Sequence, residues 1–213
     1  MIDVVEIPNE LANGIEKELY SIKPQWSYFD STTDFYNRAS QEQQKIIDKH
    51  SKNYGPVIDT QRFSYIVYQH GYGATSFYSS IKTNPNSYHR KHFTFLPKLI
   101  DYFQDTYIPN NYEVERIFVN MQTVRPRWSM NNIHPDLRMK GGITILYYVN
   151  NSDGDTYFFN NIECIKSVSP TKGKAVVYPA DTFHAGSTPV TTETRTVINL
   201  VFIPRDMAKY PYD

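Results

Sequence analysis

Three residues in the second half of the chain have the types and spacing to bind a metal ion. His134 and Asp136 stand two apart in the run His-Pro-Asp, and residues two apart in an extended segment point to the same side. His184, which follows a predicted strand ending at Tyr178, can supply a third ligand. Two imidazoles and one carboxylate on one face of a metal leave positions open for a cosubstrate and O₂, as in ferrous oxygenases. Taken alone this pattern is weak, because most histidines are surface or core residues.

Arg195 strengthens the metal hypothesis. It opens a predicted strand after a turn rich in Gly, Ser, Thr and Pro, beyond His184. The strand is otherwise apolar, with Val197, Ile198, Leu200, Val201 and Phe202. A charge in such a strand needs a partner. A hairpin would return the guanidinium toward the metal, where it could grip a carboxylate through two parallel hydrogen bonds. The alternative is an ordinary arginine at a strand edge.

The elements that must position these residues are short strands. Segments rich in β-branched and aromatic residues cover residues 113–123, 143–149, 156–159, 174–178 and 195–203, with turn residues between them. Several short strands in this part of the chain favour a sandwich or barrel over a parallel sheet with crossovers. Tyr148 should share one face of its strand with Leu146 and Thr144, while Tyr147 and Ile145 share the other.

The first half of the chain has helical periodicity instead. Apolar spacing predicts helices over residues 8–20, 41–48 and 92–107, which would brace one face of the strands. We therefore expect one domain over residues 1–213. Within it, residues 1–112 form a mostly helical support region, residues 113–203 form the core, and residues 204–213 form a tail.

Composition narrows the class of protein further. Lys and Arg total 22 and Asp and Glu total 22, so the net charge is zero and no global field favours nucleic acid or an anionic membrane. A single cysteine excludes an internal disulfide framework and a cysteine-based zinc site. The N-terminal residues lack a signal-peptide pattern, and no apolar stretch is long enough to span a membrane. We expect a cytoplasmic protein.

The strand segments carry a family resemblance. The runs HPD, ITILYYVNNSDGDTYFF, PTKGKAVVYPADTFHAG and RTVINLVF, in this order, resemble the 2-oxoglutarate/Fe(II)-dependent oxygenases of the prolyl-4-hydroxylase-like branch, including versions common in tailed bacteriophages. The resemblance covers roughly residues 113–203. It implies an α+β, mainly β fold with a double-stranded β-helix (jelly-roll, cupin-like) core braced by the N-terminal helices. It also implies Fe(II), 2-oxoglutarate and O₂, and the cytoplasm of the host if the protein is phage-encoded.

Site residues carry over from the family one by one. His134, Asp136 and His184 match the iron ligands, and these three are the implied catalytic centre. Arg195 matches the residue that binds the distal carboxylate of 2-oxoglutarate, and Tyr148 matches a tyrosine that shares this carboxylate in some relatives. Asn120 and Gln122, on the strand before HPD, are the last two residues that could contact the cosubstrate. The alternative is that they are inward-facing polar residues hydrogen-bonded to the barrel backbone.

Two features depart from, or add to, this pattern. The run Asp153-Gly154-Asp155-Thr156 stands where relatives commonly have Gly-Gly-Glu-Thr. We predict that Asp153 and Asp155 cap a turn rather than take part in catalysis. Four basic residues flank HPD, either as a cover over the pocket that meets an anionic substrate or as a solvated surface. They are Arg125, Arg127, Arg138 and Lys140. Trp128 lies in the same segment and could form a substrate platform or pack this cover onto the barrel.

The implied reaction is hydroxylation of a C–H bond with release of succinate and CO₂. The branch resembled and the zero net charge favour a prolyl or other peptidyl substrate, or a small molecule. The basic segment keeps a nucleic-acid or metabolite substrate as an alternative, with the same chemistry. A non-catalytic, cupin-like binding module is the second alternative, disfavoured because a binder has no reason to keep all four site residues.

Overall fold

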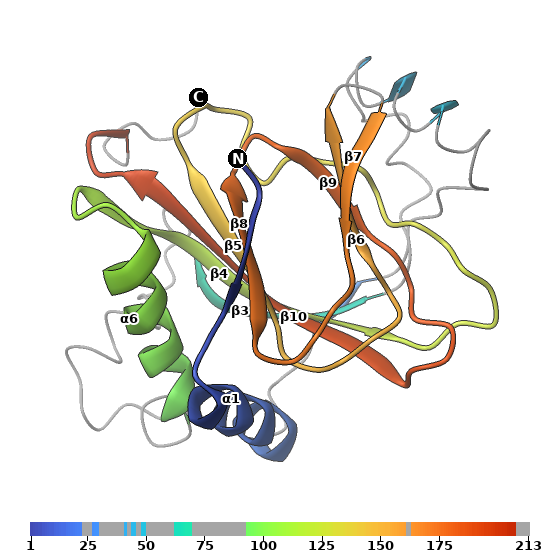
Figure 1. The fold of residues 1–213 in the computed structure, drawn as a ribbon, viewed down its shortest axis with the longest axis horizontal. Helices are drawn as coiled ribbons and strands as arrows, with labels where there is room; N and C mark the ends of the chain where they lie inside the picture. Colours follow the sequence, from blue (N-terminus) through green and yellow to red (C-terminus); the bar gives the residue numbers. More distant parts are fainter. Residues whose placement is uncertain are drawn as a thin grey trace.

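The computed structural model describes residues 1–22, 27–29, 41, 44–45, 48–49, 62–69, 93–160 and 163–207. Two antiparallel sheets dominate it, with helices on one side of the larger sheet (Figure 1). The large sheet has the order β1-β8-β5-β10-β4-β3-β2, and the small sheet has the order β7-β6-β9. Helices and mostly antiparallel sheets make this an α+β fold.

The strands of the large sheet are β1 (Asp3–Glu6), β2 (Ser27–Phe29), β3 (Arg62–Gln69), β4 (Tyr112–Thr123), β5 (Ile143–Tyr148), β8 (Lys174–Pro179) and β10 (Thr194–Pro204). Those of the small sheet are β6 (Thr156–Asn160), β7 (Glu163–Val168) and β9 (Phe183–Gly186). The helices are α1 (Asn9–Ile22) and α6 (Phe95–Tyr107). No helix in these described segments is long and apolar enough to cross a membrane.

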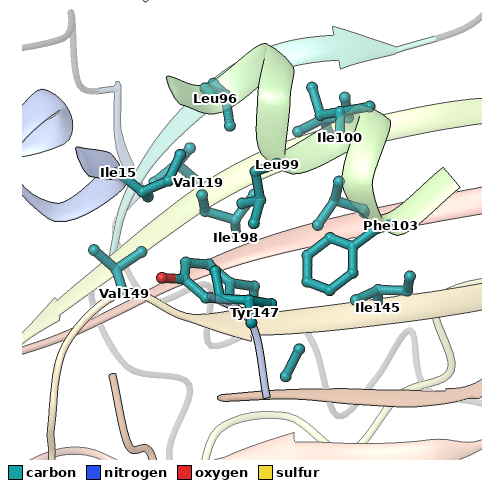
Figure 2. Close-up of a cluster of buried hydrophobic side chains, with 14 of the residues drawn as sticks. Ile15, Leu96, Leu99, Ile100, Phe103, Val119, Ile145, Tyr147, Val149 and Ile198 are labelled. Carbon is teal, nitrogen blue, oxygen red and sulfur yellow. The ribbon is translucent and has the colours of Figure 1, made fainter. Parts of the chain in front are cut away.

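Both helices pack their apolar faces on the large sheet. Ile15 of α1 and Leu96, Leu99, Ile100 and Phe103 of α6 are fully buried. They meet Val119, Ile145, Tyr147 and Ile198 of the sheet, as Figure 2 shows. Burying this much apolar surface is the main stabilising contribution. It fixes the orientation of the sheet, so the opposite face is turned toward the small sheet.

Strand alternation then decides which side chains enter the space between the sheets. Tyr147 and Ile145 lie in the core under the helices, whereas Tyr148 and Leu146 lie in a second cluster on the opposite face. The predicted alternation along β5 is therefore confirmed. The second cluster includes Phe158 of the small sheet, so the two sheets pack face to face around a common interior.

The first half of the chain differs from expectation. The helices predicted over residues 8–20 and 92–107 correspond to α1 and α6. Of the third predicted helix, residues 41, 44, 45 and 48 are helical and the others lie outside the described residues. The prediction that residues 1–112 form a mostly helical support region is wrong in part, because β1, β2 and β3 join the large sheet. β1 and β2 are too short for a periodic signal, and β3 gains its partner, β4, only in the tertiary fold.

The five strands predicted in the second half are confirmed within one or two residues at each end. β7 and β9 were not predicted. β9 has four residues, and β7 is largely exposed on both faces, so neither shows an apolar alternation. This omission matters because β9 carries His184.

Candidate metal and cosubstrate site

Backbone pairing brings the two histidines together. His134 and His184 exchange both backbone hydrogen bonds, at 3.0 and 3.1 Å, and Asn131 N–H donates to Gly186 O at 2.8 Å. The segment before Asp136 thus runs beside β9 as an added edge of the small sheet. One ligand atom from each of His134, Asp136 and His184 lies within 4.8 Å of the others. The predicted triad is brought together as a cluster that could hold a metal ion.

Each imidazole is oriented by a backbone carbonyl. His134 Nδ1 lies 2.7 Å from Asn132 O, and His184 Nδ1 lies 3.0 Å from Thr182 O. A carbonyl only accepts, so Nδ1 carries the hydrogen and Nε2 keeps its lone pair. A second hydrogen bond of this type is what fixes the tautomer of metal-binding histidines. Both Nε2 atoms are therefore prepared to bind a cation.

The carboxylate of Asp136 is held from two sides. Oδ1 accepts hydrogen bonds from Arg116 Nη2 at 2.6 Å and Asn199 Nδ2 at 3.0 Å. Oδ2 accepts from Thr144 Oγ1 and Tyr178 Oη, each at 3.0 Å. These four donors fix the plane of a side chain that is 2% exposed.

The Oδ2 atom faces the histidines. It lies 3.6 Å from His184 Nε2, and the Tyr178 hydroxyl lies 3.3 Å from the same nitrogen. Burial alone would raise the pKa of Asp136, but His184, Arg116 and the other neighbours together lower it to about 2. Burial and the same carboxylate hold the pKa of Tyr178 well above its ordinary value, so its hydroxyl stays a donor. Asp136 is consequently ionised at neutral pH.

Sequence reasoning missed these four donors. Arg116, Thr144 and Tyr178 come from β4, β5 and β8, and the register places all three in one row across the large sheet, the first two both opposite Val201. Asn199 of β10 adds the fourth donor. The sequence held one signal for Arg116: residue parity places it on the same face of β4 as Asn120 and Gln122, which were predicted to lie in the site. The neighbouring strands give no such sign until they are paired.

Arg195 is a buried cation that forms no ion pair with an acidic side chain in the described part of the chain, although Asp155 lies near enough to favour its charged form. Its Nε donates to Gly154 O at 2.7 Å, its Nη2 to Thr156 Oγ1 at 2.8 Å and its Nη1 to Gln122 Oε1 at 3.4 Å. Burial lowers the pKa of Arg195, although a guanidinium remains charged. Because a guanidinium has five N–H groups, two remain to grip an anion.

Two glycines make room for this guanidinium. A Cβ on Gly186 would lie 2.9 Å from Arg195 Cζ, and one on Gly154 would lie 2.9 Å from Arg195 Cδ. Since real Cβ atoms do not approach so closely, a side chain at either position would displace the arginine or the local backbone. Gly186, which belongs to the turn predicted after His184, therefore has a steric role in the site.

The remaining predicted residues lie around Arg195. Tyr148 is fully buried and its hydroxyl donates to Thr156 Oγ1 at 2.9 Å, the same oxygen that Arg195 contacts. Burial raises the pKa of Tyr148 to about 12, so it remains a neutral donor. Asn120 and Gln122 both line the cavity, and Gln122 Nε2 also donates to Asn131 Oδ1 at 2.8 Å.

The two histidines and Arg195 line one cavity. It is lined by Asn120, Gln122, Asn131, Asn132, His134, Leu146, Thr156, His184, Gly186, Arg195, Val197 and Asn199. Arg195 and Asn199 are four residues apart on β10, which places the arginine roughly 13 Å along the strand from the Asp136 end. Leu146 and Val197 supply an apolar surface between. The cavity thus has an imidazole-lined end beside a cluster that could hold a metal ion, an apolar middle and a cationic end.

The basic segment divides between two places. Arg138 and Lys140 line a separate groove, whereas Arg125 and Arg127 line neither this groove nor the cavity at Arg195. Trp128 packs edge-on against Tyr157 with ring centroids 6.3 Å apart, in a cluster on the outer face of the small sheet. Of the two expectations for Trp128, packing onto the sheet is the one observed. Asp153, as predicted, caps a turn by accepting hydrogen bonds from residues 190–192.

Solved structures of similar shape share little sequence with the chain. A prolyl hydroxylase from Trichoplax adhaerens, in complex with a peptide fragment of the hypoxia inducible factor oxygen degradation domain, is 11% identical with a TM-score of 0.46, over 94% of each chain. An oxidoreductase of the 2OG-Fe(II) oxygenase family from Burkholderia pseudomallei is 11% identical with a TM-score of 0.48, over 94% of each chain. AviO1 from Streptomyces viridochromogenes is 9% identical with a TM-score of 0.47, over 95% of this chain and 89% of that one.

No protein-family model matches the sequence, and a search of curated proteins returns no significant match. The comparisons thus rest on shape.

Proposed function

We propose that the protein is an Fe(II)- and 2-oxoglutarate-dependent oxygenase built on a double-stranded β-helix core. The observation that carries the proposal is Arg195, a buried cation that forms no ion pair among the described residues and lines the same cavity as His134 and His184, the two imidazoles that cluster with the Asp136 carboxylate. A buried charge of this kind needs a counterion. A dicarboxylate that also binds a metal is a ligand that satisfies both ends.

The donor set fits iron(II). His134 and His184 each offer an imidazole Nε2, and Asp136 offers a carboxylate oxygen, which is the facial triad of non-haem iron oxygenases. The chemistry that bound iron would supply is O₂ activation, in which 2-oxoglutarate gives succinate and CO₂ and a substrate C–H bond is hydroxylated. The protein contributes orientation and exclusion of water.

The rest of the cavity orients the cosubstrate. Arg195 binds the distal carboxylate through its two remaining N–H groups, and Tyr148 holds Thr156 in place behind it. Leu146 and Val197 contact the two methylene groups. Asn120 and Gln122 provide polar contacts at the side of the cavity, as the family resemblance implies.

For the primary substrate we propose a prolyl or other peptidyl group, hydroxylated at carbon. Support comes from the branch that the sequence resembles and from the zero net charge, which gives nucleic acid no general attraction. We likewise propose a cytoplasmic location, that of the host if the protein is phage-encoded. A nucleic acid or small metabolite remains the alternative substrate, and a cupin-like binder the alternative class.

Two measurements test the function. Succinate formation should require both Fe(II) and 2-oxoglutarate, whereas a binding module would take up metal and form no succinate. Calorimetry with Mn(II), a redox-silent substitute, should show sharply weaker binding for His134→Ala, Asp136→Ala and His184→Ala. Unchanged metal affinity in all three variants would refute the triad. Arg195→Ala should weaken 2-oxoglutarate binding and leave metal affinity nearly intact. Its matched control is Arg205→Ala, which changes an arginine just past β10 and outside the cavity and should affect neither affinity.

A further inference from the structure

A second, larger hollow lies on the other side of the metal-binding segments. This groove has a volume of about 1010 Å³, and Pro135, Leu137 and Phe183 line it. These residues alternate along the chain with His134, Asp136 and His184, so their side chains point away from the metal cavity. The groove therefore follows the outer face of the two segments whose inner face holds the triad.

The lining combines positive charge with apolar surface. Its cations are Arg138, Lys140 and Lys166, and Asp181 is its one acidic residue, so three positive charges stand against one negative charge. This contrasts with the zero net charge of the whole chain. The apolar part of the lining comprises Met1, Ile2, Pro135, Leu137, Phe159, Ile165, Pro179 and Phe183.

Two of the cations are available to a partner. Arg138 and Lys140 are exposed and form no ion pair within the described residues, whereas Lys166 donates from Nζ to Ile2 O at 2.7 Å. A ligand with carboxylates would meet Arg138 and Lys140 first. Phe183, which is half-buried and pairs with the buried Phe159 in the sheet register, would lie beneath its apolar side chains.

One wall of the groove is an open sheet edge. Within the described residues, β7 pairs with β6 on one side and with no strand on the other. Ile165 of β7 lines the groove and is 54% exposed, so its side chain is accessible to a partner. Such an edge offers backbone N–H and C=O groups to an incoming extended chain. A nucleic acid cannot form this pairing, so the edge favours a peptide.

We propose that this groove is a docking site for an extended, acidic peptide segment of the substrate protein, outside the cavity in which the reaction occurs. Carboxylates of the segment bind Arg138 and Lys140, its apolar side chains cover Phe183 and Ile165, and its backbone pairs with β7. The assignment of the segment to a substrate rests on the proposed oxygenase function, whereas peptide binding itself does not. Docking away from the metal raises substrate affinity and leaves the chemical step unchanged.

Direct binding to the metal-free protein tests the site. The probe is a fluorescent peptide in which glutamates alternate with leucines around a central proline. Arg138→Glu/Lys140→Glu should weaken its binding on the order of tenfold or more, because two attractions become repulsions. The matched control is Arg125→Glu/Arg127→Glu, the same charge change in the same segment outside the groove, which should bind as wild type. Equal losses in both variants would refute the site.

Two further probes separate the modes of binding. Methylating alternate backbone nitrogens of the peptide should abolish binding if it pairs with β7, and retention of full affinity would contradict strand addition. Short single-stranded DNA should bind weakly. DNA binding that is strong, steeply salt-dependent and lost in the Arg138→Glu/Lys140→Glu variant would replace the peptide by a nucleic acid.

Kinetics then connects the groove to the reaction. With a peptide that carries both docking segment and target residue, the Arg138→Glu/Lys140→Glu variant should have a raised KM and an unchanged kcat. An equal fall in kcat would place the groove in the catalytic machinery and overturn the docking role. If peptide binding behaves as expected but no succinate forms, the docking site stands and the oxygenase function fails.

Discussion

Replacing Gly186 by alanine should disable the cosubstrate site without removing any group that binds the ligand. The new Cβ would lie 2.9 Å from Cζ, 2.9 Å from Nη2 and 3.0 Å from Nη1 of Arg195. The guanidinium cannot move aside freely, because hydrogen bonds to Gly154 O, Thr156 Oγ1 and Gln122 Oε1 hold it. It must tilt out of the position in which its two remaining N–H groups face the cavity.

The magnitude follows from the contact that is lost. A charge-assisted bidentate contact in a buried site contributes about 2–4 kcal/mol, and Arg195→Ala should lose all of it. Gly186→Ala keeps the charge and loses the alignment, so we expect about 2 kcal/mol, roughly 30-fold weaker 2-oxoglutarate binding. Affinity for Mn(II) should stay near wild type, because the substitution leaves the three side chains of the triad unchanged.

Calorimetric titration of the Mn(II)-loaded protein with 2-oxoglutarate measures this change. Combining Gly186→Ala with Arg195→Lys provides the control, because the slimmer lysine end relieves the clash and the two losses should not add. Wild-type 2-oxoglutarate affinity in Gly186→Ala would show that Arg195 does not hold the carboxylate. A loss that is fully additive with Arg195→Lys would show that the glycine acts by another route.

Three further changes test the surroundings of the site. Tyr178→Phe removes a donor from Asp136 Oδ2 and should weaken Mn(II) binding roughly 10- to 100-fold in calorimetry; an unchanged affinity would mean that this hydrogen bond does not orient the ligand. Asp136 has a pKa of about 2 against an ordinary 3.8, so its charged form stabilises the metal-free fold above pH 3.8. That contribution, on the order of 2 kcal/mol, should disappear as the pH falls through about 2, and unfolding free energies of Asp136→Asn should lack this part of the pH dependence. Asp153→Ala removes the acceptor for Thr191 and Thr192 in the turn before β10 and should cost roughly 1–3 kcal/mol in thermal unfolding, with a secondary loss of 2-oxoglutarate affinity.

The sequence alone was sufficient for the features that are local. Alternation along β5 placed Tyr148 on the side opposite Tyr147, because side-chain direction in a strand depends only on residue parity. Spacing within His-Pro-Asp put His134 and Asp136 on one side for the same reason. Helical periodicity located α1 and α6, whose apolar faces must be buried wherever they pack.

Tertiary structure decided everything that depends on which strands are neighbours. The donors Arg116, Thr144, Tyr178 and Asn199 come from four strands, and they surround Asp136 only because the register aligns them. Pairing beside β9, itself too short to show a pattern, brought His134 opposite His184. Likewise the four basic residues around HPD form one cluster in sequence, yet the chain separates Arg138 and Lys140 from Arg125 and Arg127. Residue type and spacing constrain a strand's own faces, whereas pairing between strands is set by contacts across the whole chain.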